Sequence, residues 1–389
     1  MTLTLADLDF LVTEAGVALL QRLADEDLSE THTLTLLTKL RRTYSAEQAG
    51  TALTMARLRQ KADLKFGTDA ARMFFTPDAL EQASDPLVRR YRSAGMVGQR
   101  LYDMGCGIGA DSLAFAAAGA DVTGLDSDTL RIAMARHNAS ALGLPARFEV
   151  ADIREVKPTA DVIFFDPARR DEAGRRIFDV EQYQPPLSTV QRWQAQQKLV
   201  KLSPGVELEQ LAGYGGAVEF ISVKGDLKEA VLHLGTEMPA RRATLLTGEA
   251  AYHMDAGEMV TAPLSEPRGW LAEPDPAVLR AGLVADLALT LAAYQLDETI
   301  AYLTADVLPR SPWVRSWRVL DWMPLHLKRL RAYLREKRVG RVTVKKRGVS
   351  LTPEEVLAAL KLKGSESRVL VLTRCLGQHC VLICEDRVY

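Results

Sequence analysis

The stretch that most constrains the fold is "LYDMGCGIGADSLAFAAAGADVTGLDSD", residues 101–128, which places three glycines between an apolar run and a helix-like run. The apolar run ends in an acid, Asp103. Glycines let a chain turn tightly and let a ligand approach backbone amides, and the N-terminus of the following helix offers unpaired N–H groups. The stretch therefore predicts a strand–turn–helix that holds a nucleotide-like ligand.

The spacing of the glycines indicates the kind of ligand. Gly105, Gly107 and Gly109 form G-x-G-x-G. The dinucleotide fingerprint has G-x-G-x-x-G, so that a pyrophosphate can lie on the end of the helix. The carboxylate of Asp103 would repel a pyrophosphate and attract a sulfonium or an ammonium group. We therefore expect an adenosyl ligand that carries positive charge.

Acids also end the next two predicted strands. Asp126 ends "DVTGLD", a position that suits a carboxylate accepting both ribose hydroxyls. Asp152 ends "RFEVAD" and can accept from the adenine amine, with Ile153 packing on the ring. The candidate cofactor-binding residues are Asp103, Gly105, Gly107, Gly109, Asp126, Ser127, Asp152 and Ile153.

These motifs resemble those of the class I S-adenosylmethionine-dependent methyltransferases. "DMGCGIG", "GLDSD" and "VADI" match the first three motifs of that family in order and at normal spacing. The resemblance covers roughly residues 98–250. It implies a Rossmann-like fold with S-adenosyl-L-methionine as cofactor. The alternative is a nucleotide-binding or degenerate Rossmann domain without transferase activity.

The same resemblance points to "DVIFFDPARR", residues 161–170, because the fourth strand tip of this fold faces the methyl group. Methyltransferases acting on exocyclic amines of bases often carry Asn or Asp, two prolines and an aromatic residue there. Here Ala168 and Arg169 replace the last two. The resemblance implies Asp166, Pro167 and Arg169 as catalytic candidates, with Asp166 orienting the acceptor. The simpler alternative is that Asp166 and Pro167 only end a strand.

"DPAR" also resembles the RNA 5-methyluridine methyltransferases, which attack the pyrimidine through a cysteine just after the fifth strand. In this chain that place reads "VKLSPG", with Lys201 and Ser203. A serine is a poor substitute for a thiolate nucleophile. Direct transfer of the methyl group is therefore the expected chemistry.

Three kinds of sequence pattern follow one another along the chain. The first has Leu, Ala and Met three or four residues apart, which predicts helices, with Phe74 and Phe75 as core side chains more readily than a lid. Strand and helix patterns then alternate, which predicts a doubly wound sheet. After a linker-like stretch at 253–269, residues 276–296 have a helical pattern, and strand, helix, strand, strand follow. The expected domains are 1–95, 96–250 and 265–389.

A basic run interrupts an otherwise neutral chain. Residues 328–347 contain ten Lys or Arg and one Glu, whereas the whole chain has 49 Lys+Arg and 50 Asp+Glu. Such an excess fits a footprint on a phosphate backbone. A solvated helix face followed by an edge strand protected by lysines is the alternative. The RNA-binding candidates are Lys328, Arg329, Arg331, Lys345, Lys346 and Arg347.

The C-terminal region is similar to the THUMP-like domain of a bacterial methyltransferase family. "VTVKKRGVSLTPEEVLAALKLKG" and "EPDPAVLRAGLV" carry this similarity, which extends across most of residues 268–386. THUMP domains proper occur in tRNA-modifying enzymes and bind RNA. The implied fold class is α/β, a doubly wound Rossmann-like methyltransferase domain with an α-helical N-terminal domain and an α+β THUMP-like C-terminal domain.

The cysteines and the N-terminus bear on location. Cys106, Cys375, Cys380 and Cys384 are too few for a disulfide framework, which indicates a reducing compartment. The last three are expected to be apolar fillers of a hairpin turning near Gly377, without a metal. Neither a signal pattern nor a membrane-length apolar run is present. A soluble cytoplasmic protein is expected.

The sequence thus predicts an S-adenosylmethionine-dependent methyltransferase that modifies a base nitrogen of tRNA or rRNA. Two alternatives stay open. One is an RNA-binding protein with a vestigial cofactor site. The other is a methyltransferase acting on DNA, protein or a small molecule.

Overall fold

The structure, a computed structural model, describes residues 3–170 and 174–389. Its contacts divide the chain into two compact units. Unit 1 contains residues 1–216 and 229–237, and unit 2 contains residues 217–228 and 238–389. Among the described residues, no helix is long and apolar enough to cross a membrane.

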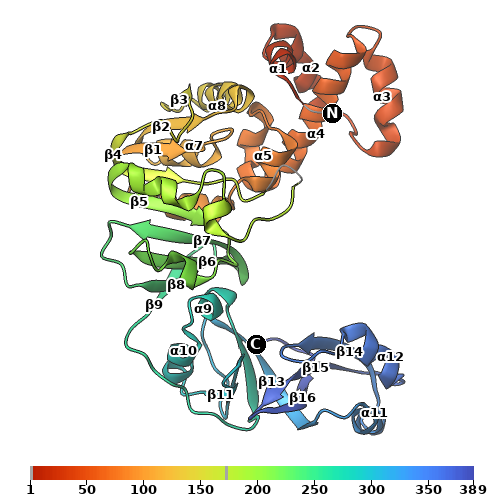
Figure 1. Ribbon diagram of the computed structural model, residues 1–389. Coiled ribbons are helices and arrows are strands. Elements are labelled where there is room, and N and C mark those ends of the chain that lie inside the picture. The colour runs from red at the N-terminus through yellow and green to blue at the C-terminus, as the bar shows by residue number, and fades with distance from the viewer. Residues whose placement is uncertain (1–2, 171–173) are drawn as a thin grey trace. The chain divides into compact units, whose positions relative to one another are not determined.

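The N-terminal part of unit 1 is helical, as expected. Its helices are α1 (Leu5–Leu11), α2 (Glu14–Ala24), α3 (Thr33–Leu40), α4 (Ala46–Phe66), α5 (Pro77–Gln82) and α6 (Pro86–Ser93), with 3₁₀ turns at Glu30–His32 and Gly67–Arg72. Figure 1 shows these helices in red and orange beside the first sheet. Ser45 begins the longest of them, α4, with a capping box in which Ser45 and Gln48 bond each other's backbone N–H.

The rest of unit 1 is a sheet with helices between its strands. The strands are β1 (Arg100–Met104), β2 (Asp121–Asp126), β3 (Arg147–Val150), β4 (Thr159–Phe165), β5 (Gln194–Leu202) and β7 (Asp226–Leu234). The helical segments are α7 (Ala110–Ala117), α8 (Thr129–Leu142) and 3₁₀ turns at Val180–Gln182, Leu187–Arg192 and Leu208–Leu211. The strands lie in the order β3-β2-β1-β4-β5-β7. The first five are parallel, so their carboxyl ends share one edge.

One apolar cluster joins the N-terminal helices to the sheet layer. It contains Leu8 and Leu19 from the first two helices together with Ile132 of α8 and Phe148 of β3. Phe74 and Phe75 are buried in the same cluster, which makes them core residues as expected. The amide of Asn138 on α8 accepts from Phe74 N at 2.7 Å and donates to Phe74 O at 3.1 Å. The helical region is therefore packed onto the sheet layer as part of one core.

Unit 2 contains two groups of strands. The first is β6 (Ala217–Val223), β8 (Arg241–Leu246) and β9 (Ala251–Asp255). The second is a seven-stranded sheet in the order β11-β12-β10-β13-β16-β15-β14. Its strands are β10 (Trp270–Pro274), β11 (Tyr294–Asp297), β12 (Ile300–Ala305), β13 (Val314–Pro324), β14 (Val339–Lys346), β15 (Glu366–Cys375) and β16 (Gln378–Glu385). The helices are α9 (Pro276–Arg280), α10 (Val284–Thr290), α11 (Leu327–Glu336) and α12 (Pro353–Leu360).

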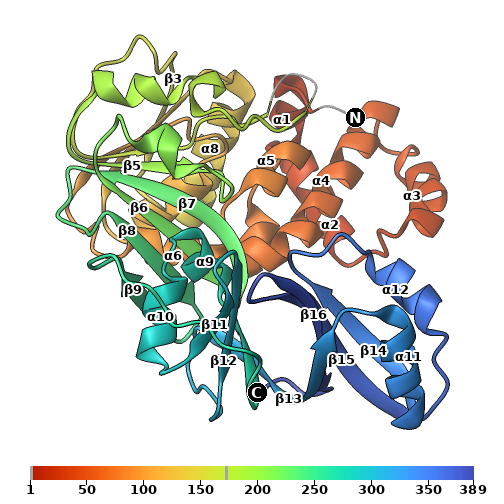
Figure 2. The ribbon, with the colours of Figure 1, turned by 60° about the horizontal axis from the view of Figure 1, so that its bottom comes forward.

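Two apolar clusters fill the two faces of the C-terminal strands. Leu330 and Leu334 of α11 and Val356 of α12 belong to one of them, and Figure 2 shows both helices beside β14 and β15. The other cluster contains Trp317 and Tyr302. It also buries Cys375, Cys380 and Cys384, which lie in the β15–β16 hairpin that turns at Leu376 and Gly377. The strand, helix, strand, strand order is confirmed, and so is the expected fold class.

Two local expectations were wrong. The predicted helix over 276–296 is two short helices, because Gly282 adopts φ +68° between them, and its last residues form β11. The linker-like stretch at 253–269 is also shorter than expected, because its first residues belong to β9, which pairs with β8.

Candidate active site

The glycine turn after β1 has a backbone that only glycine adopts easily. Gly105, Gly107 and Gly109 have φ values of +88°, +55° and +85°. Gly105 N and Cys106 N both donate to Leu125 O, at 2.8 and 2.9 Å, which holds the turn against the end of β2. A Cβ on Gly109 would lie 3.1 Å from the ring of Phe148. The turn is therefore fixed from both sides.

Asp126 is bonded to the same turn. Its Oδ2 accepts from Gly107 N at 2.9 Å and its Oδ1 accepts from Asp128 N at 2.9 Å. The carboxylate is buried, whereas the next residue, Ser127, is exposed. Two backbone bonds therefore hold the carboxylate of Asp126 in one orientation beside the glycines.

Asp103 lies below the turn and is 1% exposed. Its Oδ2 accepts from Ser112 Oγ at 2.5 Å, while its Oδ1 has no hydrogen-bond partner among residues 3–170 and 174–389. Burial, followed by the nearby carboxylate of Asp111, raises the pKa of Asp103 to about 8. A cation, or a hydrogen-bond donor of a ligand, would bind favourably beside a buried carboxyl that has one unpartnered oxygen.

Asp152 follows β3 and is bonded by its near neighbour Arg154. Arg154 Nε donates to Oδ1 at 2.9 Å and Nη2 donates to Oδ2 at 2.5 Å, and these bonds lower the pKa of Asp152 to about 2. Ala151 N donates to Asp126 O at 3.0 Å, which brings the two strand tips together. Ile153 is buried. An adenine contact by Asp152 would have to share this carboxylate with Arg154, and it stays a prediction.

Asp166 lies directly beside the glycine turn. A Cβ on Gly105 would be 3.2 Å from Asp166 O, so only glycine leaves this space free. Lys201, at the end of β5 and 4% exposed, donates from Nζ to Asp166 Oδ2 at 2.7 Å. Arg169 Nη2 is 4.0 Å from Asp166 Oδ1. The strand tips thus place a carboxylate with one oxygen held by lysine at the edge where the cofactor candidates gather.

The segment after Asp166 forms part of the rim of the site. Ala168 and Gln184 exchange two backbone hydrogen bonds of 3.0 Å, and Pro167 is buried. Arg170 Nη2 bonds Glu81 Oε1 at 2.7 Å, which joins this segment to the end of α5. The sequence "DPARRDEAGRR", residues 166–176, holds four arginines near this rim, but its middle, residues 171–173, lies outside the described residues.

One buried group of charged residues beside the site was missed from the sequence. The guanidinium of Arg92 on α6 bonds Asp111 Oδ1 at 2.5 Å and also bonds Glu229 Oε1 on β7, and it lies 4.5 Å from the centre of the Phe164 ring. All three charged side chains are at most 10% exposed. Burial is the main cause of the raised pKa of Asp103, and within this group Asp111 raises that pKa further while Arg92 lowers it.

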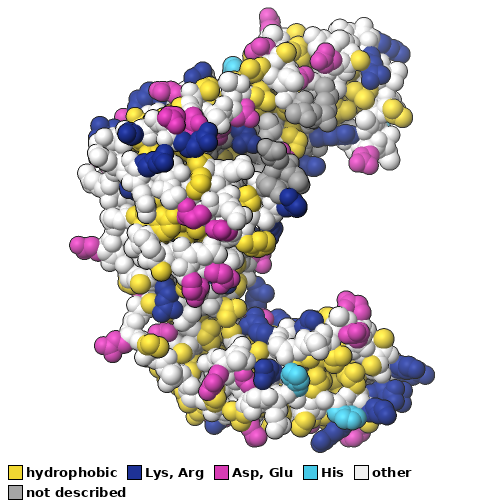
Figure 3. Space-filling model, in the orientation of Figure 1, with side chains coloured by type: hydrophobic (Ala, Val, Ile, Leu, Met, Phe, Trp, Pro, Cys, Tyr) yellow, Lys and Arg dark blue, Asp and Glu magenta, His cyan; other side chains and the backbone are white. Residues whose placement is uncertain are grey.

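The six RNA-binding candidates do not form one surface. Figure 3 shows Lys and Arg side chains over the part of unit 2 that carries α11 and α12. Lys345 lies 4.4 Å from the Trp317 ring and Arg347 lies 4.8 Å from the Tyr302 ring, on the sheet face opposite α11. Lys346 faces the other way because side chains alternate along a strand. The α11 candidates are Lys328, Arg329 and Arg331, of which the first two are exposed and the third is half-buried.

The chain matches known proteins along most of its length. Sequence profiles match a methyltransferase domain over residues 101–169, a THUMP domain-like family over 314–386 and a domain of unknown function over 4–62. Two uncharacterized S-adenosylmethionine-dependent methyltransferases, from Mycobacterium tuberculosis strains CDC 1551 and H37Rv, are each 34% identical over 329 residues. These matches cover 82% of this chain and 90% of each relative.

The chain belongs to the S-adenosylmethionine-dependent methyltransferases.

Two further similarities place this methyltransferase. The crystal structure of a candidate methyltransferase from Porphyromonas gingivalis W83 has the same fold, with a TM-score of 0.73 and 20% identity over 92% of this chain and 98% of that one. A shorter match joins 80 residues, at 40% identity, to the 23S rRNA (uracil(1939)-C(5))-methyltransferase RlmD of Thiobacillus denitrificans. This match covers 18% of each chain.

The residues at the strand tips fit the cofactor of this methyltransferase family. S-adenosylmethionine carries an ammonium and a sulfonium, and the unpartnered Oδ1 of buried Asp103 is an acceptor suited to a cationic group. The carboxylate of Asp126 is already oriented by the turn. Gly105, Gly107 and Gly109 leave the backbone of the turn open to a ligand, since side chains there would be strained.

The raised pKa of Asp103 predicts that cofactor binding releases a proton. With a pKa of about 8, the carboxyl is mostly protonated in the free methyltransferase near neutral pH, and a cation placed beside it lowers the pKa. The affinity for S-adenosylmethionine should therefore rise by up to about 25-fold between about pH 6 and pH 7.5. Calorimetry in buffers of different ionisation enthalpy measures the proton count directly.

Two variants decide the origin of that proton. Asp103→Asn should bind with little dependence on pH over the same range, because its side chain does not titrate. Asp126→Ala should bind weakly at every pH, because it loses the carboxylate without changing the titrating group. Proton release that persists in Asp103→Asn would assign the proton to another residue.

Proposed function

We propose that this methyltransferase transfers a methyl group directly to a base nitrogen of an RNA, either tRNA or rRNA. The observation that carries the proposal is the pair formed by Asp166 and Lys201 beside the glycine turn. S-adenosylmethionine supplies an electrophilic methyl group on a sulfonium. Asp166 accepts the N–H of the incoming base through Oδ1, the oxygen that Lys201 does not bond, which orients the nitrogen for attack. As the N–C bond forms, the C–S bond breaks, S-adenosylhomocysteine leaves, and the proton of the nitrogen passes to solvent.

The cofactor roles proposed for the strand-tip residues follow from their places in unit 1. Asp103 receives the cationic methionine end, and the glycines bring backbone close to the ligand. Asp126 accepts the ribose hydroxyls, with Ser127 beside it, and Asp152 and Ile153 contact the adenine. Pro167 and Arg169 line the acceptor side, where the guanidinium of Arg169 can stack on a base or hold a phosphate.

The ammonium of Lys201 at the end of β5 supports direct transfer over covalent catalysis. RlmD of Thiobacillus denitrificans is a uracil C5 methyltransferase, and enzymes of that type use a cysteine after the fifth strand. In this chain the corresponding place holds Lys201, whose Nζ bonds Asp166, followed by Ser203. An ammonium bonded to a carboxylate does not add to a pyrimidine ring, so an acceptor atom that is itself nucleophilic is favoured.

RNA as the substrate class is supported by the C-terminal region. Residues 314–386 match a THUMP domain-like family, and residues 328–347 carry a local excess of positive charge in a neutral chain. The local similarity to an rRNA methyltransferase points the same way. DNA, protein or small-molecule substrates, and RNA binding without catalysis, are the alternatives that the following experiment tests.

Mass spectrometry of modified nucleosides tests the proposal most directly. Total tRNA and rRNA from cells with and without the gene should differ by one N-methylated nucleoside, and purified protein with S-adenosylmethionine should restore it on RNA from the deletion strain. A protein carrying Asp126→Ala serves as the negative control in the restoration. Identical nucleoside profiles in both strains, together with no transfer in vitro, would reject RNA as the substrate.

A further inference from the structure

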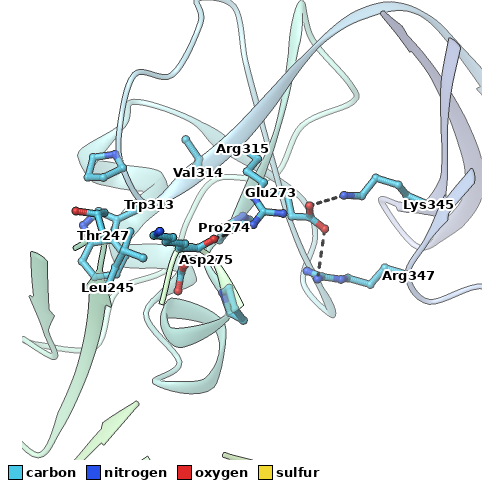
Figure 4. Close-up of a pocket in the computed structure, with 14 residues that line it drawn as sticks. Leu245, Thr247, Glu273, Pro274, Asp275, Trp313, Val314, Arg315, Lys345 and Arg347 are labelled. Atoms are coloured by element: carbon cyan, nitrogen blue, oxygen red, sulfur yellow. Dashed lines mark hydrogen bonds and ion pairs between the residues drawn. The ribbon is translucent and has the colours of Figure 1, made fainter. Parts of the chain in front are cut away.

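A second candidate site lies wholly within unit 2. A pocket of about 380 Å³ opens where the turn after β6 meets β10, β13 and the end of β14 (Figure 4). Four cationic side chains from three distant segments line it, and they are Lys224, Arg315, Lys345 and Arg347. Its carboxylates are those of Glu273 and Asp275. With all six groups ionised, the lining therefore carries an excess of positive charge.

Glu273 lies between two of the cations. Its Oε2 accepts from Lys345 Nζ at 2.6 Å and its Oε1 is 3.9 Å from Arg347 Nη2. Figure 4 shows both cations pointing at this one carboxylate. The three side chains are 18% to 31% exposed, so the cluster is partly screened from water but still open to a ligand.

The two cations are positioned before any ligand arrives. Lys345 lies over Trp317 and Arg347 lies over Tyr302, and Arg347 Nη1 also donates to Ala301 O at 3.2 Å. Cation–π contacts of this kind hold the long side chains in place. An anion that binds them therefore costs little side-chain entropy, because the side chains are already ordered.

Two further charged side chains of the pocket, those of Asp275 and Arg315, leave room for an anion. Asp275 Oδ1 accepts from Ser222 Oγ at 2.6 Å and from Ala277 N at 2.8 Å, so this carboxylate is engaged in capping α9. Arg315 lies against Gly225, whose φ of +88° and missing Cβ allow the guanidinium to approach. Arg315 is exposed, and Nη2 donates to Lys224 O at 3.3 Å.

We propose that this pocket binds one phosphate group of the RNA, with Arg315, Lys345 and Arg347 as its ligands. In the free protein, Glu273 occupies the position between the cations that the phosphate takes. Carboxylates and phosphates are recognised by the same guanidinium and ammonium donors, which makes the exchange chemically reasonable. The volume is that of a small-ligand site, which favours one nucleotide over a broad backbone track. The inference rests on RNA being the substrate class.

Calorimetry on the full chain tests the pocket with three probes. They are a 5′-phosphorylated tetraribonucleotide, its 5′-hydroxyl counterpart and inorganic phosphate. Lys345→Gln with Arg347→Gln should weaken tetraribonucleotide binding at least about tenfold and lower the salt slope by about 0.7, the value for one phosphate of a single strand. Lys363→Gln is the matched control, since Lys363 is exposed and outside the pocket, and it should change the affinity less than about twofold.

A second variant separates a built pocket from a diffuse basic surface. Glu273→Gln removes the competing carboxylate and should tighten binding of the same tetraribonucleotide about three- to tenfold. Glu298→Gln, an exposed acid outside the pocket, should leave the affinity unchanged. Equal effects of the pocket and control variants, or weaker binding by a folded Glu273→Gln protein, would overturn the inference. Circular dichroism establishes that each variant is folded.

The outcomes also separate this inference from the proposed function. If the protein methylates RNA but the pocket variants bind the probes like the wild type, the pocket inference fails and the RNA substrate stands. If RNA methylation is absent but phosphate binding still depends on Arg347, the site is an anion site without an RNA role, and the RNA assignment of the pocket is overturned. At least about tenfold tighter binding of the 5′-phosphorylated probe assigns a terminal phosphate, and equal binding assigns a backbone phosphate.

Discussion

Arg92→Met should lower the free energy of unfolding by about 3–5 kcal/mol, measured by urea unfolding at neutral pH. The substitution leaves the carboxylates of Asp111 and Glu229 buried without their shared cation. It also removes the contact of the guanidinium with the Phe164 ring. Removing one partner from a buried ion cluster lowers the stability because the remaining charges are buried without a counter-charge or water.

The pH dependence of this loss distinguishes electrostatics from packing. Burial favours a high pKa for Asp111, but Arg92, Lys201, Arg89 and the hydrogen bond from Ser84 together outweigh it and hold the pKa below the ordinary value, with Arg92 the largest of these contributions. Without Arg92, burial raises the pKa of Asp111, so this carboxyl takes up a proton more readily in the folded state than in the unfolded state. The deficit of Arg92→Met relative to wild type should therefore shrink as the pH falls toward about 5.

Two companion variants complete the test. Arg90→Met removes an exposed arginine from the same helix and should cost less than about 1 kcal/mol. Arg92→Lys keeps the charge but loses the forked geometry, so its cost should be intermediate. A loss in Arg92→Met that is as small as that in Arg90→Met, or that is independent of pH, would mean that the charge cluster does not stabilise the fold.

Asp166→Asn should reduce the rate of methyl transfer about 10²- to 10³-fold while the affinity for S-adenosylmethionine changes by less than about threefold. The amide has the size of the carboxylate but only one oxygen. It cannot accept hydrogen bonds from both the N–H of the base and Lys201 as strongly as the two carboxylate oxygens do. The readout is incorporation of labelled methyl groups into RNA from the deletion strain, at saturating cofactor, beside calorimetric binding of the cofactor.

Two further variants provide the controls, one at the far end of β4 and one at the end of β5. Asp161→Asn changes a carboxylate at the opposite end of β4, where its Oδ2 accepts from Arg100 N at 2.8 Å, and should change the rate less than about threefold. Lys201→Met should reduce the rate less than Asp166→Asn, because the carboxylate remains but is no longer held. A rate for Asp166→Asn close to wild type would remove Asp166 from the reaction.

The local sequence pattern was sufficient to place the candidate site residues that lie at strand ends or in the turn that follows one. Asp103 and Asp126 lie near the ends of β1 and β2, and the three glycines lie in the turn between β1 and α7, where the order of strands and turns indicated. The bond from Lys201 to Asp166 was not predictable, since it depends on the reach of a side chain between two strands.

Other features depend on distant partners or on competition between neighbours. Arg92 and Glu229 are far apart in sequence, and "RRYRS" looks like an ordinary solvated helix face until β7 is in place. The pairing of Asp152 with Arg154 was visible in "ADIR", yet the pattern could not rank this pair against an adenine contact. Alternation along β14 could have shown that Lys345 and Lys346 point to opposite faces.

The apolar cluster shared by the N-terminal helices and the sheet layer has a consequence for how the chain is made. Leu8 and Leu19 leave the ribosome long before Ile132 and Phe148, the residues that complete their packing. At about 5–20 residues per second, the intervening segment takes several seconds to synthesise. During that time the apolar side chains of the leading helices that pack on α8 and β3 are without these partners, so this part of the core closes only after the sheet layer has been synthesised.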